Sequence, residues 1–445
     1  MNDAVTGPVR WGFIGAGNIA RTALAPAVHA ADGAVLQAAA ARDPARAAAL
    51  RPVRVHATYD DLLAADDVDA VYISLNNDAH LPWTLAALQA GKHVLCEKPL
   101  GLTAAEVDRM VAAAQRAGRT VVEASWYRWH PRVRLAQARL PEIGPVAHVT
   151  AGFSFDGVPA GDYRLDPARG GGALYDVGCY AVSACLWAVG RGLPDEVVAR
   201  ADKGPTGVDL DTRAVLSWAD GPDAEVRAGI SGTGQWLVIT GERGEIELRD
   251  APFTAWKDNA TELWVSDGSG TERAPVPATD AYRVMVEEMS SVLSGGPGWL
   301  LPLAQSRDTA AVLDAIRASA AANGAPVRPG PGPDPVAALV MLTVPELAQR
   351  LGTDVVNARG TLRAGTFLAV SRDGVLLVPE RQLDGDQPVK HLVPVLRLLR
   401  DAKYTDIEAL AWLATPDDSL PGSPFDALHE NRATEVKRRA QALGF

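Results

Sequence analysis

Three residues carry side chains that could exchange a proton with a reacting substrate: Lys98, Asp176 and Tyr180. Asp176 and Tyr180 stand four positions apart, so in a helix they would lie one turn apart on the same face. Tyrosine has an ordinary pKa near ~10, and a nearby ammonium such as that of Lys98 would lower it. Together they could handle the proton that accompanies hydride transfer at a carbonyl carbon, with either Tyr180 or Lys98 as the donor. Taken alone, a lysine before a proline at a strand end is usually a solvated loop charge, and an aspartate and a tyrosine four positions apart are more often a surface pair.

Such chemistry needs a hydride carrier, and the start of the chain has a motif for one. Residues 15–20 read Gly-Ala-Gly-Asn-Ile-Ala, after an apolar run and before an alanine-rich segment. In a strand–turn–helix unit the first glycine permits the tight turn. The second lets the backbone approach a pyrophosphate at the helix N-terminus. The motif therefore predicts dinucleotide binding at Gly15, Gly17, Asn18 and Ile19, with an ordinary glycine turn as the alternative.

The choice between NADP and NAD should be made at the end of the second strand, where the sequence reads Ala41-Arg42-Asp43-Pro44. An acidic residue there favours NAD by binding the ribose hydroxyls, whereas an arginine favours the 2′-phosphate of NADP. Arg42 comes first, and Asp43 stands where it could cap the next helix. The sequence therefore favours NADP, with NAD as the alternative.

The composition limits the class of protein. A chain of 445 residues with 47% hydrophobic and 22% charged residues is typical of globular proteins with two to four domains. The net charge of −11 means that binding to a polyanion would need a local basic patch. Three cysteines argue against a disulfide framework and for a cytoplasmic location. The scattered histidines predict no metal site, and the sequence predicts neither a signal peptide nor a membrane segment.

The residues before 126 alternate between short apolar runs and helical patterns. Apolar runs at 9–15, 35–40, 69–75, 92–96 and 121–122 predict strands. Thr103 and Glu106 form a capping-box pattern that opens a helix to about residue 117. Strands that alternate with helices predict a parallel sheet covered on both faces.

The character changes after Ser125. Strand-like runs at 146–155, 214–218, 225–230, 236–240 and 245–248 predict an open, largely antiparallel sheet. Helices are expected at about 280–293 and 303–322. Residues 324–335 hold five prolines and three glycines and predict a linker.

The tail has the element order of a winged helix-turn-helix. Thr343 and Glu346 predict a helix to Leu351, Thr353 could cap a second helix to about Arg363, and residues 366–379 predict a hairpin around Asp373-Gly374. Arg359, Arg363 and Arg372 would then face DNA. From residue 335 onward there are 13 Lys and Arg against 14 Asp and Glu, a net charge of −1. DNA-binding domains usually have a positive face, so an interaction or oligomerisation domain is the alternative.

Several motifs in this order resemble the Gfo/Idh/MocA oxidoreductases over about residues 9–325. These are the glycine loop, Asn77 with His80, Glu97-Lys98-Pro99, and the run from Gly170 to Tyr180. Residues 123–131 and Tyr180 are most similar to the dihydrodiol and NADP-dependent xylose dehydrogenases and to glucose–fructose oxidoreductase. The tail resembles winged-helix DNA-binding proteins that are substrates of serine/threonine kinases. The segment between 49 and 59 and the region near 219–240 look shorter than in the family, which puts its sheet-to-sheet dimer in doubt.

The resemblance implies roles for individual residues. It places Lys98, Asp176 and Tyr180 in the catalytic site. It implies cofactor contacts by Leu75, Asn77, His80, Glu97 and Lys98, and substrate contacts by Trp126, Tyr127, Arg128 and, more weakly, Arg164. Inter-domain packing is the alternative for the aromatic segment at 126–129.

We therefore expect an α/β protein with an N-terminal Rossmann domain, an α+β substrate domain, a winged helix-turn-helix and a helical end. The expected ranges are 1–125, 126–323, a linker at 324–335, 336–384 and 385–445. The first hypothesis is an NAD(P)-dependent dehydrogenase acting on a small sugar-like or dihydrodiol substrate, with a DNA-binding tail and a homo-oligomeric state. The second is a non-catalytic regulator that senses a dinucleotide or sugar. A third is two independent activities joined on one chain.

Overall fold

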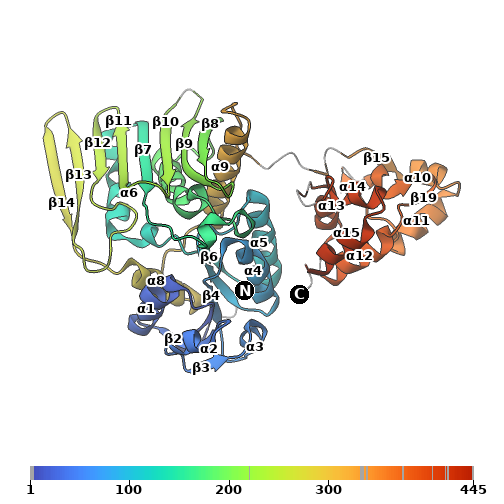
Figure 1. The fold of residues 1–445 in the computed structure, drawn as a ribbon, viewed down its shortest axis with the longest axis horizontal. Coiled ribbons are helices and arrows are strands. Elements are labelled where there is room, and N and C mark those ends of the chain that lie inside the picture. Colours follow the sequence, from blue (N-terminus) through green and yellow to red (C-terminus); the bar gives the residue numbers. More distant parts are fainter. Residues whose placement is uncertain are drawn as a thin grey trace. The chain divides into compact units, whose positions relative to one another are not determined.

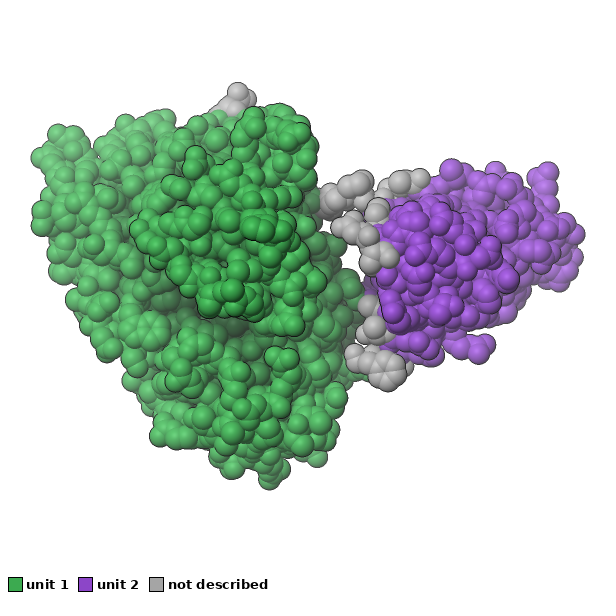
Figure 2. All heavy atoms as spheres, in the orientation of Figure 1, with its two compact units in different colours: residues 1–330 green, residues 331–445 purple. Residues whose placement is uncertain are grey.

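The helices and strands gather into two units, Met1–Gly330 (unit 1) and Pro331–Phe445 (unit 2) (Figure 1, Figure 2). The structure is a computed structural model that describes residues 5–219, 221–330, 335–336, 339–372, 375–402, 404–415, 417 and 420–442. Each unit has its own buried apolar core.

A six-stranded parallel sheet forms the first part of unit 1, as the alternating pattern predicts. Every residue of β4 (Ala70–Ile73) and β5 (His93–Cys96) is buried. The strand order β3-β2-β1-β4-β5-β6 reverses beside β1 (Val9–Ile14), and ligands bind at the carboxyl ends of the strands at such a point. The Rossmann-type arrangement is thereby confirmed. The other strands are β2 (Ala34–Ala40), β3 (Arg54–His56) and β6 (Val121–Glu123).

Helices cover both faces of this sheet. Alternate residues of β4 point into separate cores, with Tyr72 in one and Val71 in the other. The core around Tyr72 is closed by a π-helical turn (Ala20–Leu24), α1 (Ala25–Ala30) and α8 (Ala281–Leu293). The core around Val71 is closed by α3 (Tyr59–Leu63), α4 (His80–Gln89), α5 (Ala104–Ala117) and α9 (Leu303–Ala321).

The helix α8 packs against this first sheet although it comes late in the sequence of unit 1. Trp11 Nε1 donates to Ser290 Oγ at 3.1 Å, and the backbone N of Val5 donates to the Leu293 carbonyl at 2.9 Å. Met285 and Met289 are fully buried in the same core as Trp11. The core of the cofactor domain therefore draws on residues well beyond the 1–125 range expected from the sequence.

A second sheet of eight strands follows, in the order β14-β13-β12-β11-β7-β10-β9-β8. Neighbours are antiparallel, as predicted, except β7 (Val146–Ser154) and β10 (Asp223–Gly229), which run parallel. A parallel pair requires a long crossover, and this one contains α7 (Cys179–Val189). The remaining strands include three that the sequence did not predict, β8, β13 and β14. The six remaining strands of this sheet are β8 (Glu196–Lys203), β9 (Asp209–Ser217), β11 (Gly234–Gly241), β12 (Gly244–Leu248), β13 (Thr261–Asp267) and β14 (Gly270–Val276).

The helix α7 lies in the core against the second sheet. The helical stretch Pro167–Val189 is long and apolar enough to cross a membrane by length and composition, yet 83% of its most apolar window is buried inside the fold. All residues of α7 except Leu186 and Val189 are buried. The apolar character of this stretch is therefore accounted for by packing within unit 1.

The boundary between the units lies after Gly330, not before Gly324. Val327 pairs with Val197 at the end of the second sheet through two backbone hydrogen bonds of 2.8 and 2.9 Å. Pro326 and Pro329 are compatible with this pairing because an added outer strand needs few backbone donors. Residues 324–330, which the sequence assigned to a linker, therefore belong to unit 1.

Unit 2 contains the predicted winged helix-turn-helix. It has α10 (Val344–Arg350), α11 (Val355–Arg363) and a sheet in the order β15-β17-β16. Thr343 and Glu346 form the predicted capping box, but Asp354, not Thr353, caps α11 through the Asn357 N–H. The predicted turn at Asp373-Gly374 lies outside the described residues. The other helices and strands are β15 (Met341–Thr343), β16 (Val370–Arg372), β17 (Val375–Pro379), β18 (Leu383–Asp384), β19 (Gln387–Pro388), α12 (Leu392–Asp401), α13 (Asp406–Ala414), α14 (Pro424–His429) and α15 (Ala433–Ala442).

The separate cores predict separate unfolding. Phe425 is fully buried in unit 2, so Phe425→Ala should lower the free energy of unfolding of that unit by about 3–5 kcal/mol. Differential scanning calorimetry should show one transition moved to lower temperature and the other unchanged. If both transitions move together, the units do not unfold independently.

Candidate active site

Lys98 and Asp176 meet at the carboxyl edge of the first sheet. Lys98 follows β5, and Asp176 lies in a π-helical turn (Leu174–Gly178) that leads into α7. Lys98 Nζ donates to the Asp176 carbonyl oxygen at 2.7 Å and to Oδ1 at 3.2 Å. Arg164 Nε donates to the other carboxylate oxygen, Oδ2, at 2.6 Å. The structure thus brings together residues that lie far apart in the sequence.

Mutual pairing keeps this group ionised. Burial alone would raise the pKa of Asp176, but Lys98 and Arg164 outweigh burial and hold that pKa below its ordinary value. Burial alone would lower the pKa of Lys98, but the Asp176 carboxylate holds it well above its ordinary value. The site therefore presents a fixed ammonium beside a fixed carboxylate.

Tyr180 lies beside this pair, on the first turn of α7. The Lys98 ammonium is 5.2 Å from the centre of the Tyr180 ring, and Trp126 Nε1 donates to the Tyr180 hydroxyl at 3.1 Å. Burial raises the pKa of Tyr180, and the opposing effect of Lys98 is smaller. The sequence-based expectation of a lowered tyrosine pKa is therefore wrong for this structure. The hydroxyl is held in its neutral form, which can donate a proton.

Aromatic side chains surround the Tyr180 hydroxyl. Trp126 stacks on Tyr282 with ring centres 4.4 Å apart. The ring centres of Tyr127 and Tyr180 lie 5.5 Å apart, and Tyr127 donates its own hydroxyl to Ser183 Oγ at 2.9 Å. Of the predicted substrate contacts, Trp126 and Arg164 thus lie at the site, and Tyr127 lies behind it.

Arg128 is not part of this group. It is 3% exposed, donates to Gln305 Oε1 at 3.0 Å and lies near the rings of Trp187 and Trp299. The four residues Trp126–Trp129 form a 3₁₀ turn, in which successive side chains point about 120° apart. Neighbours in the sequence therefore face different parts of the fold. Arg128 has a packing role, which was the alternative for this aromatic segment.

The glycine loop forms a close backbone approach at the end of β1. Gly15 has φ +94°, and a Cβ there would overlap the Ser74 carbonyl oxygen. A Cβ on Gly17 would come within 3.3 Å of Ser74 Oγ. Asn18 and Ile19 follow, and the first helix begins at once with Ala20. The loop therefore needs glycines in order to pass close to the segment after β4, and a glycine loop between a strand and a helix fits a dinucleotide pyrophosphate.

Arg42 stands exposed at the tip of β2. Asp43 is occupied as the cap of α2 (Pro44–Ala48), because its carboxylate accepts the Ala45 N–H at 2.9 Å. Within the described ranges Arg42 forms no ion pair. The contact of Arg42 with a 2′-phosphate stays a prediction.

Asn77, His80 and Glu97 make contacts within the protein. Asn77 Nδ2 donates to the Gly170 carbonyl at 2.8 Å. His80 is fully buried with Nδ1 2.8 Å from the Pro99 carbonyl oxygen, and burial lowers its pKa to about 4. Glu97 accepts the Tyr72 hydroxyl at 2.7 Å. These side chains hold Leu75, Lys98 and the glycine run in place at the carboxyl edge of the first sheet.

The glycine run at 170–172 lets the Arg164 loop fold back on itself. Gly170 has φ +69°, and a Cβ there would lie 2.5 Å from Leu102 Cδ2. A Cβ on Gly171 would lie 2.6 Å from the Arg164 carbonyl oxygen. The motif is therefore a steric requirement for placing Arg164 against Asp176.

Two residues at the site were not identified from the sequence. Asp162 accepts a hydrogen bond from Arg164 Nη1 at 3.2 Å and orients it toward Asp176. Tyr282, on the first turn of α8, supports Trp126. Asp162 stands two residues before Arg164, a spacing that could have suggested the pair. No local signal connects Tyr282 with residue 126.

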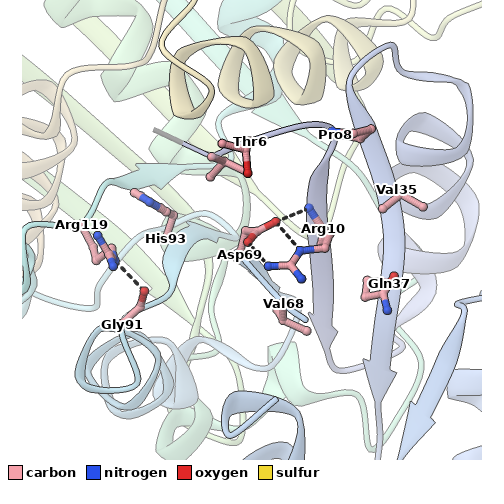
Figure 3. A pocket seen from close by; sticks show the side chains of 11 residues that line it. Thr6, Pro8, Arg10, Val35, Gln37, Val68, Asp69, Gly91, His93 and Arg119 are labelled. Atoms are coloured by element: carbon pink, nitrogen blue, oxygen red, sulfur yellow. Dashed lines mark hydrogen bonds and ion pairs between the residues drawn. The ribbon is translucent and has the colours of Figure 1, made fainter. Parts of the chain in front are cut away.

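A hollow of about 720 Å³ opens at the opposite edge of the first sheet (Figure 3). It lies at the starts of β1, β2, β4 and β5. Arg10 donates to Asp69 from its guanidinium at 2.9 and 2.6 Å, and Arg119 donates to the Gly91 carbonyl. These groups satisfy one another, and the hollow is remote from Lys98, at the wrong end of the strands for the chemistry described above.

Four family models match successive parts of the chain. "Oxidoreductase family, NAD-binding Rossmann fold" matches residues 9–125, and "GFO/IDH/MocA C-terminal domain" matches residues 138–247. "DNA-binding protein Rv2175c, wHTH domain" matches residues 334–383, and "Rv2175c C-terminal domain of unknown function" matches residues 389–444.

Individual relatives match unit 1. The D-xylose 1-dehydrogenase (NADP(+)) 2 of Haloferax volcanii is 36% identical over 70% of this chain and 97% of the relative. The trans-1,2-dihydrobenzene-1,2-diol dehydrogenase of Sus scrofa is 31% identical over 54% and 74%. A solved 3-ketoreductase from Actinomadura kijaniata, in complex with NADP and TDP-benzene, has a TM-score of 0.65 at 28% identity, covering 70% of this chain and 98% of that one.

Asp176 forms ion pairs with Lys98 and Arg164, and these three residues are here called the ion group. The ion group predicts that one neutral substitution will lower the stability of unit 1 strongly. Asp176→Asn keeps the shape but leaves Lys98 without its counter-charge and Arg164 with Asp162 as its remaining ion-pair partner. The free energy of unfolding of unit 1 should fall by about 3–5 kcal/mol at pH 7, as measured by chemical denaturation. Asp108→Asn, in a half-exposed pair with Arg307, is the matched control and should cost less than about 1 kcal/mol.

The difference should also depend on pH. The folded-state pKa of Asp176 is lowered, so its contribution is present above the unfolded pKa of ~3.9 and is lost as pH falls through the folded value. Wild type and Asp176→Asn should therefore converge in acid. Equal stability at pH 7 would show that the carboxylate does not balance these cations.

Proposed function

The chain belongs to the Gfo/Idh/MocA oxidoreductases, and we propose that Lys98, Asp176 and Tyr180 are the residues of unit 1 that serve its reaction. As a member of this family it is an NAD(P)-dependent enzyme acting on CH–OH groups. We propose a small polyhydroxylated substrate, a sugar or a dihydrodiol. The observation that carries the assignment is the ion group of Lys98, Asp176 and Arg164 beside the neutral hydroxyl of Tyr180.

NADP, when bound at the glycine cradle, supplies or accepts the hydride. The chain's own residues position the substrate oxygen and manage its proton. Lys98 Nζ, held by Asp176, offers a positive charge toward a developing alkoxide. The protonated Tyr180 hydroxyl and the Lys98 ammonium are the two groups that can donate the proton in reduction. In oxidation the same group must first lose its proton, so that its deprotonated form can accept the proton of the substrate hydroxyl.

Trp126 and Arg164 supply complementary contacts for such a substrate. The indole of Trp126 offers an apolar face, and its Nε1 orients the Tyr180 hydroxyl. The partly exposed guanidinium of Arg164 offers donors to substrate hydroxyls. The xylose and dihydrodiol dehydrogenases among the relatives act on substrates of this kind by their names. A sensor without catalysis is not favoured, because the complete ion group is present.

Substitution of the two proton carriers tests the catalytic assignment. Tyr180→Phe and Lys98→Ala should each lower the rate by about 10²–10⁴-fold. Nicotinamide absorbance should be followed with a panel of aldoses, polyols and dihydrodiols. Tyr175→Phe is the matched control, because Tyr175 lies in the π-helical turn just before α7 and donates its hydroxyl to the Leu102 carbonyl. Unchanged turnover in the first two variants would contradict the assignment. Absence of turnover with every substrate, with tight NADP binding, would favour a sensor.

We propose NADP as the preferred cofactor, supported by the exposed Arg42 and by the occupation of Asp43 as a helix cap. Asn18 and Ile19 extend the cradle of Gly15 and Gly17 toward the cofactor. Leu75, Asn77, His80 and Glu97 border the same edge.

Removal of the Arg42 side chain should lower the affinity for NADP and leave the affinity for NAD unchanged. Arg42→Ala should weaken NADP binding by about 10–100-fold, because a charge-assisted bond to phosphate is worth about 1.5–3 kcal/mol. NAD, which lacks the 2′-phosphate, is the internal control, and its dissociation constant should stay the same. Fluorescence titration measures both. Equal losses for NADP and NAD would place the 2′-phosphate elsewhere.

Unit 2 carries a winged helix-turn-helix of a DNA-binding type. We propose that α11 faces DNA through Arg359 and Arg363, both exposed. The side chain of Arg372 lies outside the described residues, and its DNA contact stays a prediction. We also propose a homo-oligomeric state, measurable by sedimentation velocity, and a cytoplasmic location, where NADP and DNA are both present.

A further inference from the structure

The outward face of α11 has an unusual set of side chains. Val356, Arg359, Gly360 and Arg363 follow one another at helical spacing and share one face, here called the α11 stripe. Val356 is 76% exposed, and both arginines are exposed. Ala358, on the other side, is fully buried in the core of unit 2. The stripe therefore faces away from that core.

Gly360 has no structural reason to be glycine. It lies in the interior of α11, and a Cβ there would meet no atom within 4 Å. Glycine weakens a helix interior relative to alanine, so alanine would fit and would stabilise α11. Gly170, by contrast, has a left-handed φ and a Cβ that would clash. Gly360 thus lowers helix stability without serving the packing of unit 2, which suits a surface where another molecule approaches the backbone closely.

The charged residues on the α11 stripe are all positive. Helix α11 contains no acidic residue between its first and last positions, although unit 2 as a whole is slightly acidic. Arg359 and Arg363 form no ion pair with any residue that the structure describes in unit 2. Other arginines of the unit are paired, as in Arg350–Glu380, Arg381–Asp426, Arg400–Asp406 and Arg432–Glu435. The positive charge left free therefore includes the stripe, which fits an anionic partner.

We propose that the α11 stripe docks in the major groove of duplex DNA, with Gly360 as the point of closest approach and Val356 against the methyl group of a thymine. This rests on the DNA-binding role proposed above for unit 2. The missing Cβ lets the helix backbone approach the base edges, and an apolar side chain discriminates thymine by its 5-methyl group. Arg359 and Arg363 contact guanine edges or phosphates. Val356 thereby becomes a determinant of sequence preference.

The first test separates stability from affinity. Duplexes selected from a random pool with the full chain are titrated by fluorescence anisotropy against wild type and Gly360→Ala. The variant should melt about 4 °C higher in unit 2, yet bind DNA roughly 10-fold more weakly. Thr434→Ala, which improves the exposed face of α15, is the matched control and should be more stable with unchanged affinity. A purely structural role of Gly360 would not move stability and affinity in opposite directions.

The second test removes a single methyl group from the DNA. Each thymine of a selected duplex is replaced in turn by uracil, which lacks the 5-methyl group. Wild type should lose about 4-fold in affinity at one position, and Val356→Ala should lose its sensitivity at that position only. Wild-type binding that is insensitive at every thymine, or full binding by Gly360→Ala, would overturn the inference.

A third variant distinguishes the inference from the role on which it rests. If Arg359→Ala weakens binding while Gly360→Ala and the uracil series have no effect, unit 2 binds DNA but the assigned contacts are wrong. If the full chain binds no duplex at physiological salt, the DNA-binding role fails, and the inference fails with it. Self-association that Val356→Ala abolishes would then identify the stripe as a protein interface.

Discussion

The ion group formed by Lys98, Asp176 and Arg164 is the constraint around which unit 1 is arranged. An unpaired buried charge is costly, so the Asp176 carboxylate can be buried, and the Lys98 ammonium largely buried, only because each has a partner of opposite charge. The group also joins the end of a parallel strand to the crossover of the second sheet. Asn77 and the glycine run then bring the two segments close enough for these contacts. The same pairing that makes burial tolerable leaves a fixed positive charge facing the reaction centre.

Much of the architecture could be predicted from local patterns, because the signals are local. The glycine loop, the helix after Thr103 and the winged-helix order depend on periodicity and capping within a few residues. The meeting of Lys98 with Asp176 was reached only through the combination of separate motifs. Arg128 was misplaced because sequence proximity does not fix direction in a 3₁₀ turn. The pKa of Tyr180 was misjudged because its burial depends on aromatic rings from distant elements.

Glycine has opposite meanings in the two units. At Gly170 the backbone conformation and the neighbouring Leu102 exclude a side chain, so the residue is explained by the fold itself. At Gly360 the helix is regular and the space is open, so the fold gives no explanation. A sequence presents the two residues identically. Only the surroundings separate a glycine that the chain needs in order to fold from one that leaves room for something else.

The return of α8 to the first sheet bears on how the protein is made. The ribosome releases the chain from its N-terminus, and domains generally fold as units as they emerge. Here the six strands are complete by Glu123, but the apolar face around Trp11 is covered only in part, by the helical segments after β1, until α8 has been synthesised as far as Leu293. During the synthesis of the residues between Glu123 and Leu293, the nascent cofactor domain thus exposes part of an apolar surface. Its dependence on chaperones should be set by this interval, and the tail emerges only after the enzyme has closed.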